Sequence, residues 1–211
     1  MNIGIIGSGD VAKALATGLS EHGHTVLLGT RNPEKLADFA AGHERIRVGS
    51  AAEAAAFAEL ALLAVKGTAA SDALRPAAAD LAGKIVIDTC NPIADTPPEN
   101  GVLSYFTGPN ESLLENLQRE FPAVRLVKAF NSVGAASMID PRFEGGPPTM
   151  FIAGDDAEAK DAVAKLLDEV GWETADMGSA VAARAIEPLA VLWCIPGLLE
   201  GRWRHAFKLL R

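Results

Sequence analysis

The first 31 residues of the chain constrain its fold more than any other stretch. An apolar run, Ile3–Ile6, is followed by two glycines and then by apolar residues at helical spacing up to Gly23. A second apolar run, Thr25–Leu28, comes next. Apolar runs this short are typical of buried strands. The stretch therefore predicts a strand, a glycine turn, a helix and a second strand, in that order.

The turn carries the pattern G-x-G-x-x-A in the residues Gly7, Ser8, Gly9, Asp10, Val11 and Ala12. Between a strand and a helix, this pattern indicates dinucleotide binding. Gly7 allows the tight turn, Gly9 leaves room for a pyrophosphate beside the backbone, and Ala12 keeps the helix close to the strand. Free N–H groups and the dipole at the helix start attract phosphates. We expect Gly7 to Val11 to contact a dinucleotide; the alternative is a glycine turn that binds nothing.

The end of the second strand indicates which dinucleotide binds. NAD sites usually place an Asp or Glu about 20 residues past the glycines, where it binds the ribose 2′-hydroxyl. No carboxylate stands at the tip of this strand, which continues as Thr30, Arg31, Asn32, Pro33, Glu34 and Lys35. A 2′-phosphate needs hydrogen-bond donors and positive charge. We therefore expect NADP(H) rather than NAD(H), with Thr30, Arg31, Asn32 and Lys35 as candidate residues. The alternative, that Arg31 and Lys35 are ordinary solvated charges, stays open.

Strand and helix patterns alternate along the rest of the first 148 residues. Predicted strands are Ile46–Val48, Leu60–Val65, Lys84–Asp88 and Val124–Ala129, and predicted helices are Ala51–Phe57, Gly67 to about Leu81, and Glu111–Phe121. Ser50 and Glu53 have the spacing of a capping box. Alternation of this kind predicts an α/β fold, a Rossmann-type doubly wound and mainly parallel sheet with right-handed crossovers.

Residues 149–211 are expected to form a small strand–helix extension that completes the sheet and the acceptor pocket. Its predicted elements are a strand Thr149–Ala153, a helix Asp156–Val170, a strand Glu173–Ala175, an apolar helix Ala180–Cys194 that Pro196 and Gly197 end, and an amphipathic helix Leu198–Arg211.

Ligands of a doubly wound sheet lie outside the carboxyl ends of its strands. The candidate residues at the remaining strand tips are Val65, Lys66, Asn91, Pro92, Phe130, Asn131 and Ser132. A carboxamide there can meet ribose hydroxyls or the nicotinamide amide without adding charge. In the alternative interpretation, Asn91 and Asn131 only cap loops, and Lys66 is solvated. We expect Asp88 to accept loop amides, whereas periodicity does not decide whether Lys128 is buried or functional.

No catalytic side chain and no metal site are predicted. His22, His24 and His43 belong to the far end of the first helix or to the second, and His205 to the last. Cys90 and Cys194 have no metal-ligand spacing. A dinucleotide site without an acid–base residue suggests hydride transfer between two bound redox cofactors.

Composition narrows the partners and the compartment. The net charge of −8 disfavours nucleic acid or an anionic membrane surface. No run reaches about 18 apolar residues, the length of a membrane span, and the first strand leaves no room for a signal peptide. Two distant cysteines favour reduced thiols in the cytoplasm.

Seven segments, in order, resemble the F420-dependent NADP oxidoreductase family. They are IGIIGSGDVAKALATGL, LLGTRNPEKL, LLAVKG, DTCNP, VKAFNSVGA, MFIAGDDAEAKDAVAKLLDEVGWETADMG and ARAIEPLAVLW. The resemblance implies hydride transfer between NADPH and a deazaflavin (F420) or flavin-like acceptor such as FMN. It also implies that Thr30, Arg31 and Lys35 hold the 2′-phosphate and that the tips at Asn91 and Asn131 shape the nicotinamide pocket. We expect a small-molecule acceptor and a homodimer.

Two other functions stay open at this point. A reductase of imines or ketones needs a large helical domain after the nucleotide-binding half, and only 57 residues follow Gly154. A non-catalytic NADPH sensor, or a reductase of another small substrate or a metal chelate, would carry the same nucleotide motif. Turnover of NADPH with F420, FMN or ferric chelates separates these functions.

Overall fold

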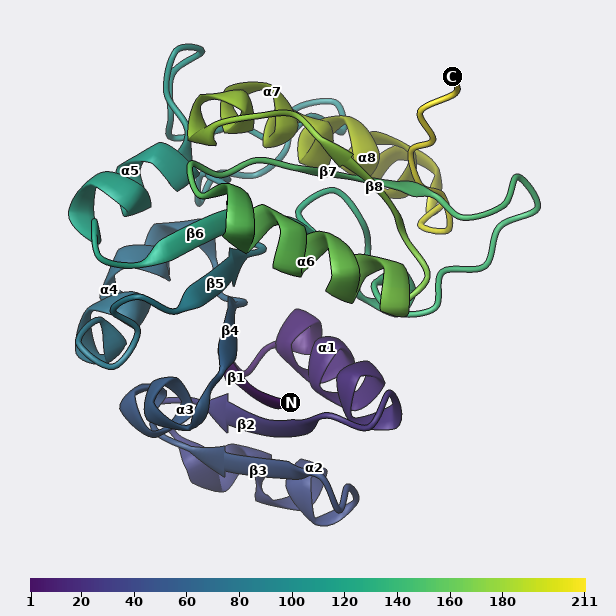
Figure 1. The fold of residues 1–211 in the computed structure, drawn as a ribbon. Helices are drawn as coiled ribbons and strands as arrows, with labels where there is room; N and C mark the ends of the chain where they lie inside the picture. Colours follow the sequence, from purple (N-terminus) through teal and green to yellow (C-terminus); the bar gives the residue numbers. More distant parts are fainter.

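A computed structural model describes all residues, 1–211, as an α/β fold around one large sheet (Figure 1). Its strands are β1 (Asn2–Ile6), β2 (Thr25–Gly29), β3 (Ile46–Gly49), β4 (Leu60–Leu63), β5 (Ile85–Asp88) and β6 (Arg125–Lys128). They are ordered β3-β2-β1-β4-β5-β6, and every neighbouring pair is parallel. The strand order reverses between β1 and β4, which is where ligands of such sheets bind. The Rossmann-type doubly wound sheet is therefore confirmed.

Helices cover both faces of the sheet. They are α1 (Asp10–Glu21), α2 (Ala37–Ala41), α3 (Ala51–Phe57), α4 (Ala70–Leu74), α5 (Leu113–Glu120) and α6 (Ala157–Glu169), with single 3-10 turns at Pro33–Leu36, Gly67–Ala69, Arg75–Ala77 and Ala135–Ser137. The predicted helix from Gly67 to Leu81 is thus three short pieces. The capping box of α3 is present, because Ser50 and Glu53 bond each other's backbone N–H groups.

Each strand alternates between two apolar cores. On β4, Leu60 and Leu62 face the core that includes α1 and α6, while Ala61 and Leu63 face the core that includes α3, α4 and α5. Burial on both faces explains why the strands appear in the sequence as continuous apolar runs.

The extension beyond residue 148 begins with a second, smaller parallel unit. Strand β7 (Thr149–Ile152), helix α6 and strand β8 (Glu173–Asp176) follow one another, and the two strands pair only with each other. An isolated antiparallel bridge between Lys128 and Ala153 joins this pair to the end of β6. The pair therefore continues the large sheet through one bridge and not through a full ladder.

The C-terminal helices differ from the prediction at two points. A 3-10 turn (Ala180–Ala182) leads into α7 (Ala183–Ile186), and α8 (Pro188–Glu200) continues through Pro196. The helix ends at Gly201, whose φ of 69° is left-handed. Pro196 lacks one N–H, at a cost of about 3 kcal/mol, but packing of this turn on the chain that follows it maintains the helix.

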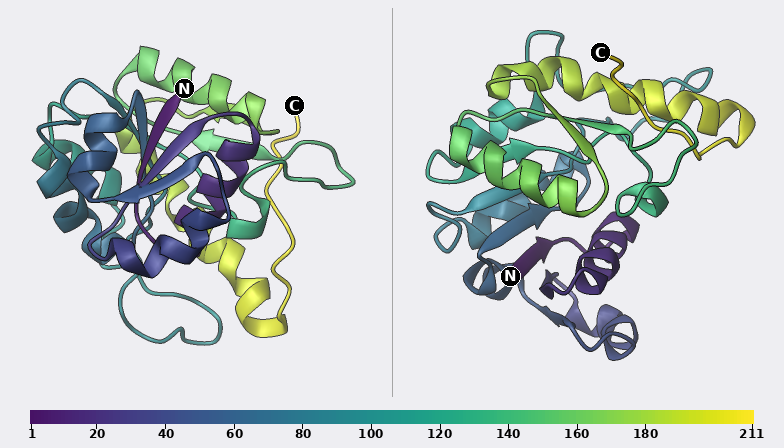
Figure 2. Two further views of the ribbon diagram at one scale, coloured as in Figure 1. Left: turned by 90° about the horizontal axis from the view of Figure 1, so that it is seen from below. Right: turned by 45° about the vertical axis from the view of Figure 1, so that its right-hand side comes forward.

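The predicted amphipathic helix Leu198–Arg211 is wrong beyond Glu200. Residues 201–211 are extended and run back along α8 (Figure 2). The backbone of this tail bonds to other elements: Phe207 accepts from Thr149 N, and His205 accepts from the Trp193 ring. The Trp193 ring also packs on Trp203 and His205. These tertiary bonds replace the helical ones.

The stretch Ala180–Glu200 is long and apolar enough to cross a membrane by length and composition, with a mean hydropathy of 1.4. About a third of it, 33%, is buried inside the protein. Its Glu187 is 1% exposed and pairs with a lysine at the end of β6. Arg184 and Glu187 interrupt the stretch, so the expectation that no uninterrupted run reaches about 18 apolar residues still holds.

Candidate functional site

The predicted site residues lie along one edge of the large sheet, which we call the carboxyl edge: the row of loops that follow β2, β1, β4, β5 and β6. The parallel register of the five strands brings these loops to the same side. In order along the edge come Thr30 to Lys35, Gly7 to Val11, Val65 and Lys66, Asn91 and Pro92, and Phe130 to Ser132. The two ends of this row differ in burial and in chemistry.

The glycine turn after β1 combines a crowded position with an open one. A Cβ at Gly7, where φ is 152°, would lie 2.1 Å from the Ala64 carbonyl oxygen, so only glycine fits between β1 and β4. A Cβ at Gly9 would meet no atom within 4 Å. Helix α1 starts at this open position without a side-chain cap, whereas Ser50, Ser112 and Asp156 cap α3, α5 and α6. Uncapped N–H groups at the start of a long helix suit a phosphate group.

The tip of β2 presents unpaired positive charge to solvent. Arg31 and Lys35 are exposed and form no ion pair, although Glu34 lies between them in sequence. The Thr30 hydroxyl accepts the Asn32 N–H at 3.2 Å and so shapes the turn. Two unpaired cations beside a hydroxyl group are suited to binding a phosphate ester.

The tip of β4 is tightly packed against the tip of β5. A Cβ at Gly67 would lie 1.9 Å from the Asn91 carbonyl oxygen. Lys66 extends into solvent, with 82% of its side chain exposed, and its Nζ lies 3.6 Å from Asp95. Lys66 is therefore available to a ligand but is held by no buried partner; Val65 beside it is half-buried.

The tips of β5 and β6 are bonded to each other through two asparagines. Asn91 Nδ2 donates to the Asn131 carbonyl at 2.7 Å, and Asn131 Nδ2 donates to Asn91 Oδ1 at 3.1 Å and to the Ile186 carbonyl at 3.0 Å. Asn131 Oδ1 is buried and has no hydrogen-bond partner. An orphaned acceptor is costly, and the other three hydrogen bonds fix the asparagines in place. The two tips therefore form one rigid polar end of the edge.

Backbone strain marks the same place. Phe130, which is 1% exposed, has a φ of 59°, a left-handed conformation that a bulky residue seldom adopts. Ser132 beside it is 6% exposed, and Pro92 is also buried. Strain of this kind concentrates at binding sites and needs support from the surrounding structure.

That support comes from three buried charged residues, Asp88, Lys128 and Glu187, which we call the buried triad. Lys128 Nζ donates to Asp88 Oδ2 at 2.6 Å, to Glu187 Oε1 at 2.8 Å and to the Cys90 carbonyl at 2.8 Å. Burial alone would lower the pKa of Lys128, but the two carboxylates outweigh it and raise the pKa, so the ammonium stays charged. Burial raises the pKa of the Cys90 thiol well above its usual range, and this cysteine is a neutral group in the wall.

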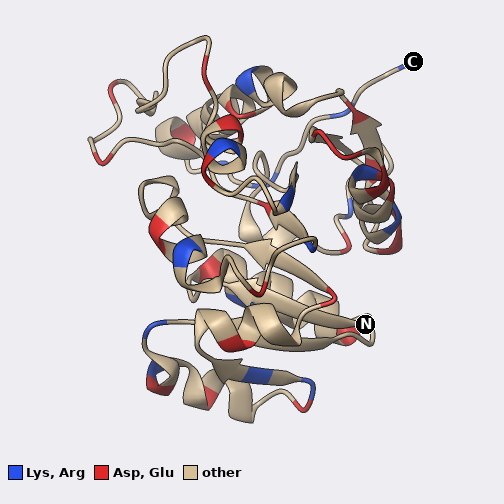
Figure 3. Ribbon diagram, turned by 60° about the vertical axis from the view of Figure 1, so that its left-hand side comes forward, with Lys and Arg blue, Asp and Glu red and all other residues tan.

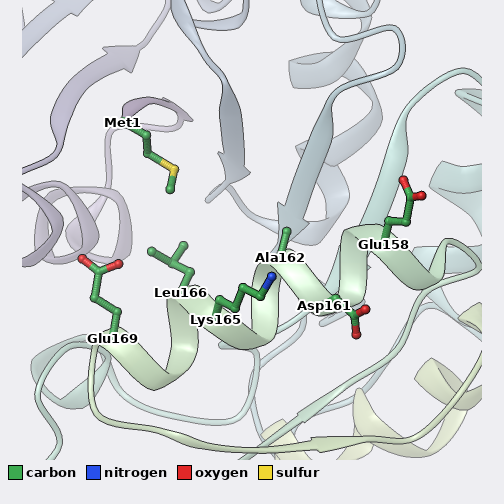
Figure 4. Close-up of a pocket in the computed structure, with 7 residues that line it drawn as sticks. All are labelled: Met1, Glu158, Asp161, Ala162, Lys165, Leu166 and Glu169. Carbon is green, nitrogen blue, oxygen red and sulfur yellow. The ribbon is translucent and has the colours of Figure 1, made fainter.

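Two cavities of this structure lie away from the carboxyl edge. One, of about 380 Å³, lies between Met1 and α6, where Glu158, Asp161, Lys165 and Glu169 line it (Figure 4). His24 lies near it and pairs with Glu169 at 3.0 Å. A second, of about 420 Å³, lies between α1 and the turn Ala135–Ser137. Figure 3 shows charged residues mainly on helices and loops, with the sheet largely uncharged.

Comparison with known proteins identifies the family. The family described as "NADP oxidoreductase coenzyme F420-dependent" matches residues 2–92. Over 206 residues the chain is 31% identical to the F420-dependent NADP reductase of Methanothermobacter marburgensis, covering 91% of this chain and 90% of that protein. The chain belongs to the F420-dependent NADP oxidoreductase family.

Two further relatives extend this result. A crystal structure of a candidate F420-dependent NADP reductase from Arthrobacter sp. FB24 superimposes with a TM-score of 0.92, at 34% identity and over 100% of both chains. The chain is also 37% identical over 202 residues to the rat metalloreductase STEAP3. That match covers 93% of this chain but 38% of STEAP3, so the chain spans little more than a third of that relative.

The family segments contain all three residues of the triad, but the sequence did not show that they meet. Glu187 stands in the segment ARAIEPLAVLW, between α7 and α8 and 59 residues after Lys128, and we predicted no role for it. A signal was present in the sequence: Asp88 and Lys128 each directly follow apolar residues at the end of a strand, and the sheet register pairs them directly. A member of the F420-dependent NADP oxidoreductase family thus carries a charged network behind its two asparagine tips.

Proposed function

We propose that this protein is an NADPH-dependent oxidoreductase that transfers a hydride between NADP(H) and a deazaflavin such as F420, or a flavin-like acceptor such as FMN. One observation carries the proposal: the uncapped start of α1 and the unpaired cations of the β2 tip lie on the same sheet edge as the asparagine tips of β5 and β6. This order matches the extended shape of a dinucleotide with a 2′-phosphate at one end.

Each group of residues has a distinct role in holding the dinucleotide. Arg31 and Lys35 bind the 2′-phosphate, with Thr30 and Asn32 forming the turn between them. Gly7 to Val11 offer N–H groups to the pyrophosphate. Val65 and Lys66 lie along the middle of the edge, and Asn91, Pro92, Phe130, Asn131 and Ser132 form the nicotinamide end. When bound, NADPH supplies two electrons and one proton as a hydride, and a proton from water completes reduction of the acceptor.

The acceptor side is formed by the irregular stretch Ile93–Asn110 and α8. The Tyr105 hydroxyl donates to the Glu187 carbonyl, and a Cβ at Gly101 would lie 2.7 Å from Leu199, so the stretch is attached to α8 at two points. A Cβ at Gly134, just past the β6 tip, would lie 2.7 Å from the Trp193 ring. These contacts support the proposal, because an aromatic and apolar wall beside the β6 tip suits a planar ring.

We propose further that the protein is cytoplasmic, acts on a small molecule and forms a homodimer. Helix α8 exposes Leu192, Leu198 and Leu199, of which Leu199 is 58% exposed. Exposed apolar side chains that cluster on one helix are typical of subunit contacts. Sedimentation of the purified protein checks this: a single monomeric species at micromolar concentration contradicts the dimer.

Anaerobic oxidation of NADPH, measured separately with F420, FMN and a ferric chelate, tests the reaction. Turnover with F420 or FMN is the expected result. Turnover with the chelate alone assigns a metal-reducing function instead. Tight NADPH binding without turnover in all three assays contradicts the enzyme and leaves the NADPH sensor as the function.

A further inference from the structure

The buried triad contains one more negative than positive charge. Each carboxylate contacts only donors: Asp88 accepts from Lys128 and the Cys90 N–H, and Glu187 from Lys128 and the N–H groups of Leu113 and Leu114. A proton on either carboxyl would face no acceptor, so both are ionised. With one ammonium between them, the three side chains carry a net charge of −1.

This charge is shielded from water. Asp88 and Lys128 are 0% exposed and Glu187 is 1% exposed. The positive end of the α5 dipole, about half a unit charge, faces Glu187 and offsets part of the excess. No further cation contacts the triad, so a negative field persists in a medium of low dielectric constant.

The triad stands directly behind the asparagine tips. Asp88 ends β5 three residues before Asn91, and Lys128 ends β6 three residues before Asn131. Glu187 follows Ile186, whose carbonyl accepts from Asn131 Nδ2 at 3.0 Å. The field of the triad therefore acts on the wall that the nicotinamide end of the proposed site uses.

We propose that Asp88 and Glu187 are positioning residues whose uncompensated charge makes the nicotinamide end select the oxidised ring over the reduced one. The oxidised nicotinamide ring is a cation and the reduced ring is neutral, so a buried negative charge lowers the free energy of the first only. The inference rests on the proposed NADP(H) site. As a consequence, bound NADP⁺ is stabilised relative to bound NADPH, and this favours hydride transfer from NADPH to the acceptor.

The test is a set of equilibrium titrations with NADP⁺, NADPH and 2′-phospho-ADP-ribose, which lacks the nicotinamide. Glu187→Gln and Asp88→Asn each remove one negative charge while retaining side-chain volume. We expect the ratio Kd(NADP⁺)/Kd(NADPH) to rise about tenfold in both variants, the order expected for one charge in a protein medium. The affinity for 2′-phospho-ADP-ribose should stay at the wild-type value.

Asp156→Asn is the matched control, because it makes the same change of group in an ion pair at the amino end of β6, where Arg125 is its partner. Its ratio should equal that of the wild type. Equal weakening of NADP⁺ and NADPH in the triad variants overturns the inference and leaves the triad a purely structural group.

Two further outcomes are told apart by the wild-type protein. If neither triad variant folds, the dissociation constants of the wild type test the inference: NADP⁺ must bind more tightly than NADPH, and the reverse order overturns the inference. If the wild type binds none of the three compounds, the proposed NADP(H) site itself has failed.

Discussion

The two ends of the carboxyl edge are built in opposite ways. At the β1 and β2 tips, Ser8, Gly9, Arg31 and Lys35 are exposed, and the two cations are unpaired. At the β5 and β6 tips, Asn131 is 5% exposed, and a saturated hydrogen-bond network lies behind it. One end can recognise its ligand by charge at little cost to folding. The other end presents fixed polar atoms whose positions depend on the buried triad.

Removal of the central ammonium should produce the largest difference between the two ends. Lys128→Met leaves two carboxylates buried and facing each other, which should lower the free energy of unfolding by about 3–5 kcal/mol. Urea denaturation measures the loss. Arg31→Met at the exposed end is the control and should change stability by less than about 0.5 kcal/mol. Similar losses of unfolding free energy in the two variants would contradict the difference in construction between the two ends.

The glycine turn should separate folding from binding within one motif. Gly9→Val places a side chain in open space where the pyrophosphate is proposed to lie, so nucleotide binding should be lost while the thermal midpoint is kept. Gly7→Val meets the Ala64 carbonyl and should unfold the protein instead. Normal NADPH affinity in a folded Gly9→Val protein would place the nucleotide elsewhere.

Arg31→Ala should act on one nucleotide only. Loss of a charge-assisted contact should weaken NADPH binding by about 1–3 kcal/mol and leave NADH binding nearly unchanged. Calorimetric titration with both nucleotides checks this. The affinity for 2′-phospho-ADP-ribose should fall by the same factor as the affinity for NADPH. An equal loss for NADH rules out a 2′-phosphate contact at Arg31.

Asn131→Ala should have the smallest effect and the complementary pattern. The substitution removes the hydrogen bonds from Asn131 Nδ2 to Asn91 and to the Ile186 carbonyl, which hold this end in shape. The affinity for NADPH should therefore fall by about 0.5–1.5 kcal/mol, whereas the affinity for 2′-phospho-ADP-ribose should stay the same. Arg31→Ala and Asn131→Ala thus distinguish the two ends of the ligand. If Asn131→Ala lowers the affinity for 2′-phospho-ADP-ribose by the same factor as the affinity for NADPH, the assignment of the nicotinamide end is wrong.

The fold could be predicted from the sequence wherever local pattern and tertiary structure agree. Short apolar runs became the strands of the large sheet, and the Ser50–Glu53 box caps α3 as its spacing predicts. Pro196 was a misleading stop signal, because packing of α8 on the tail outweighs the missing N–H. The tail beyond Glu200 has helical periodicity, but its backbone groups bond to β7 and α8.

The location of the glycines and cations at the exposed end of the edge could likewise be predicted, because strand tips are visible in the sequence, and their binding of a dinucleotide stays a prediction. The buried end could be predicted only in part. Asn91 and Asn131 are visible at strand tips, but their pairing depends on contacts across 40 residues of chain. Glu187 joins the network from the turn between α7 and α8, and no local pattern shows that it reaches Lys128.

The ratio of the dissociation constants of the wild-type protein for NADH and NADPH tests the central claim most directly. Both nucleotides share the pyrophosphate and the nicotinamide, and they differ only in the 2′-phosphate that Arg31 and Lys35 are proposed to bind. The account predicts that NADPH binds at least about tenfold more tightly, a difference of about 1.4 kcal/mol, and that the preference shrinks as salt concentration rises. Equal affinity for the two nucleotides, or tighter binding of NADH, would contradict it.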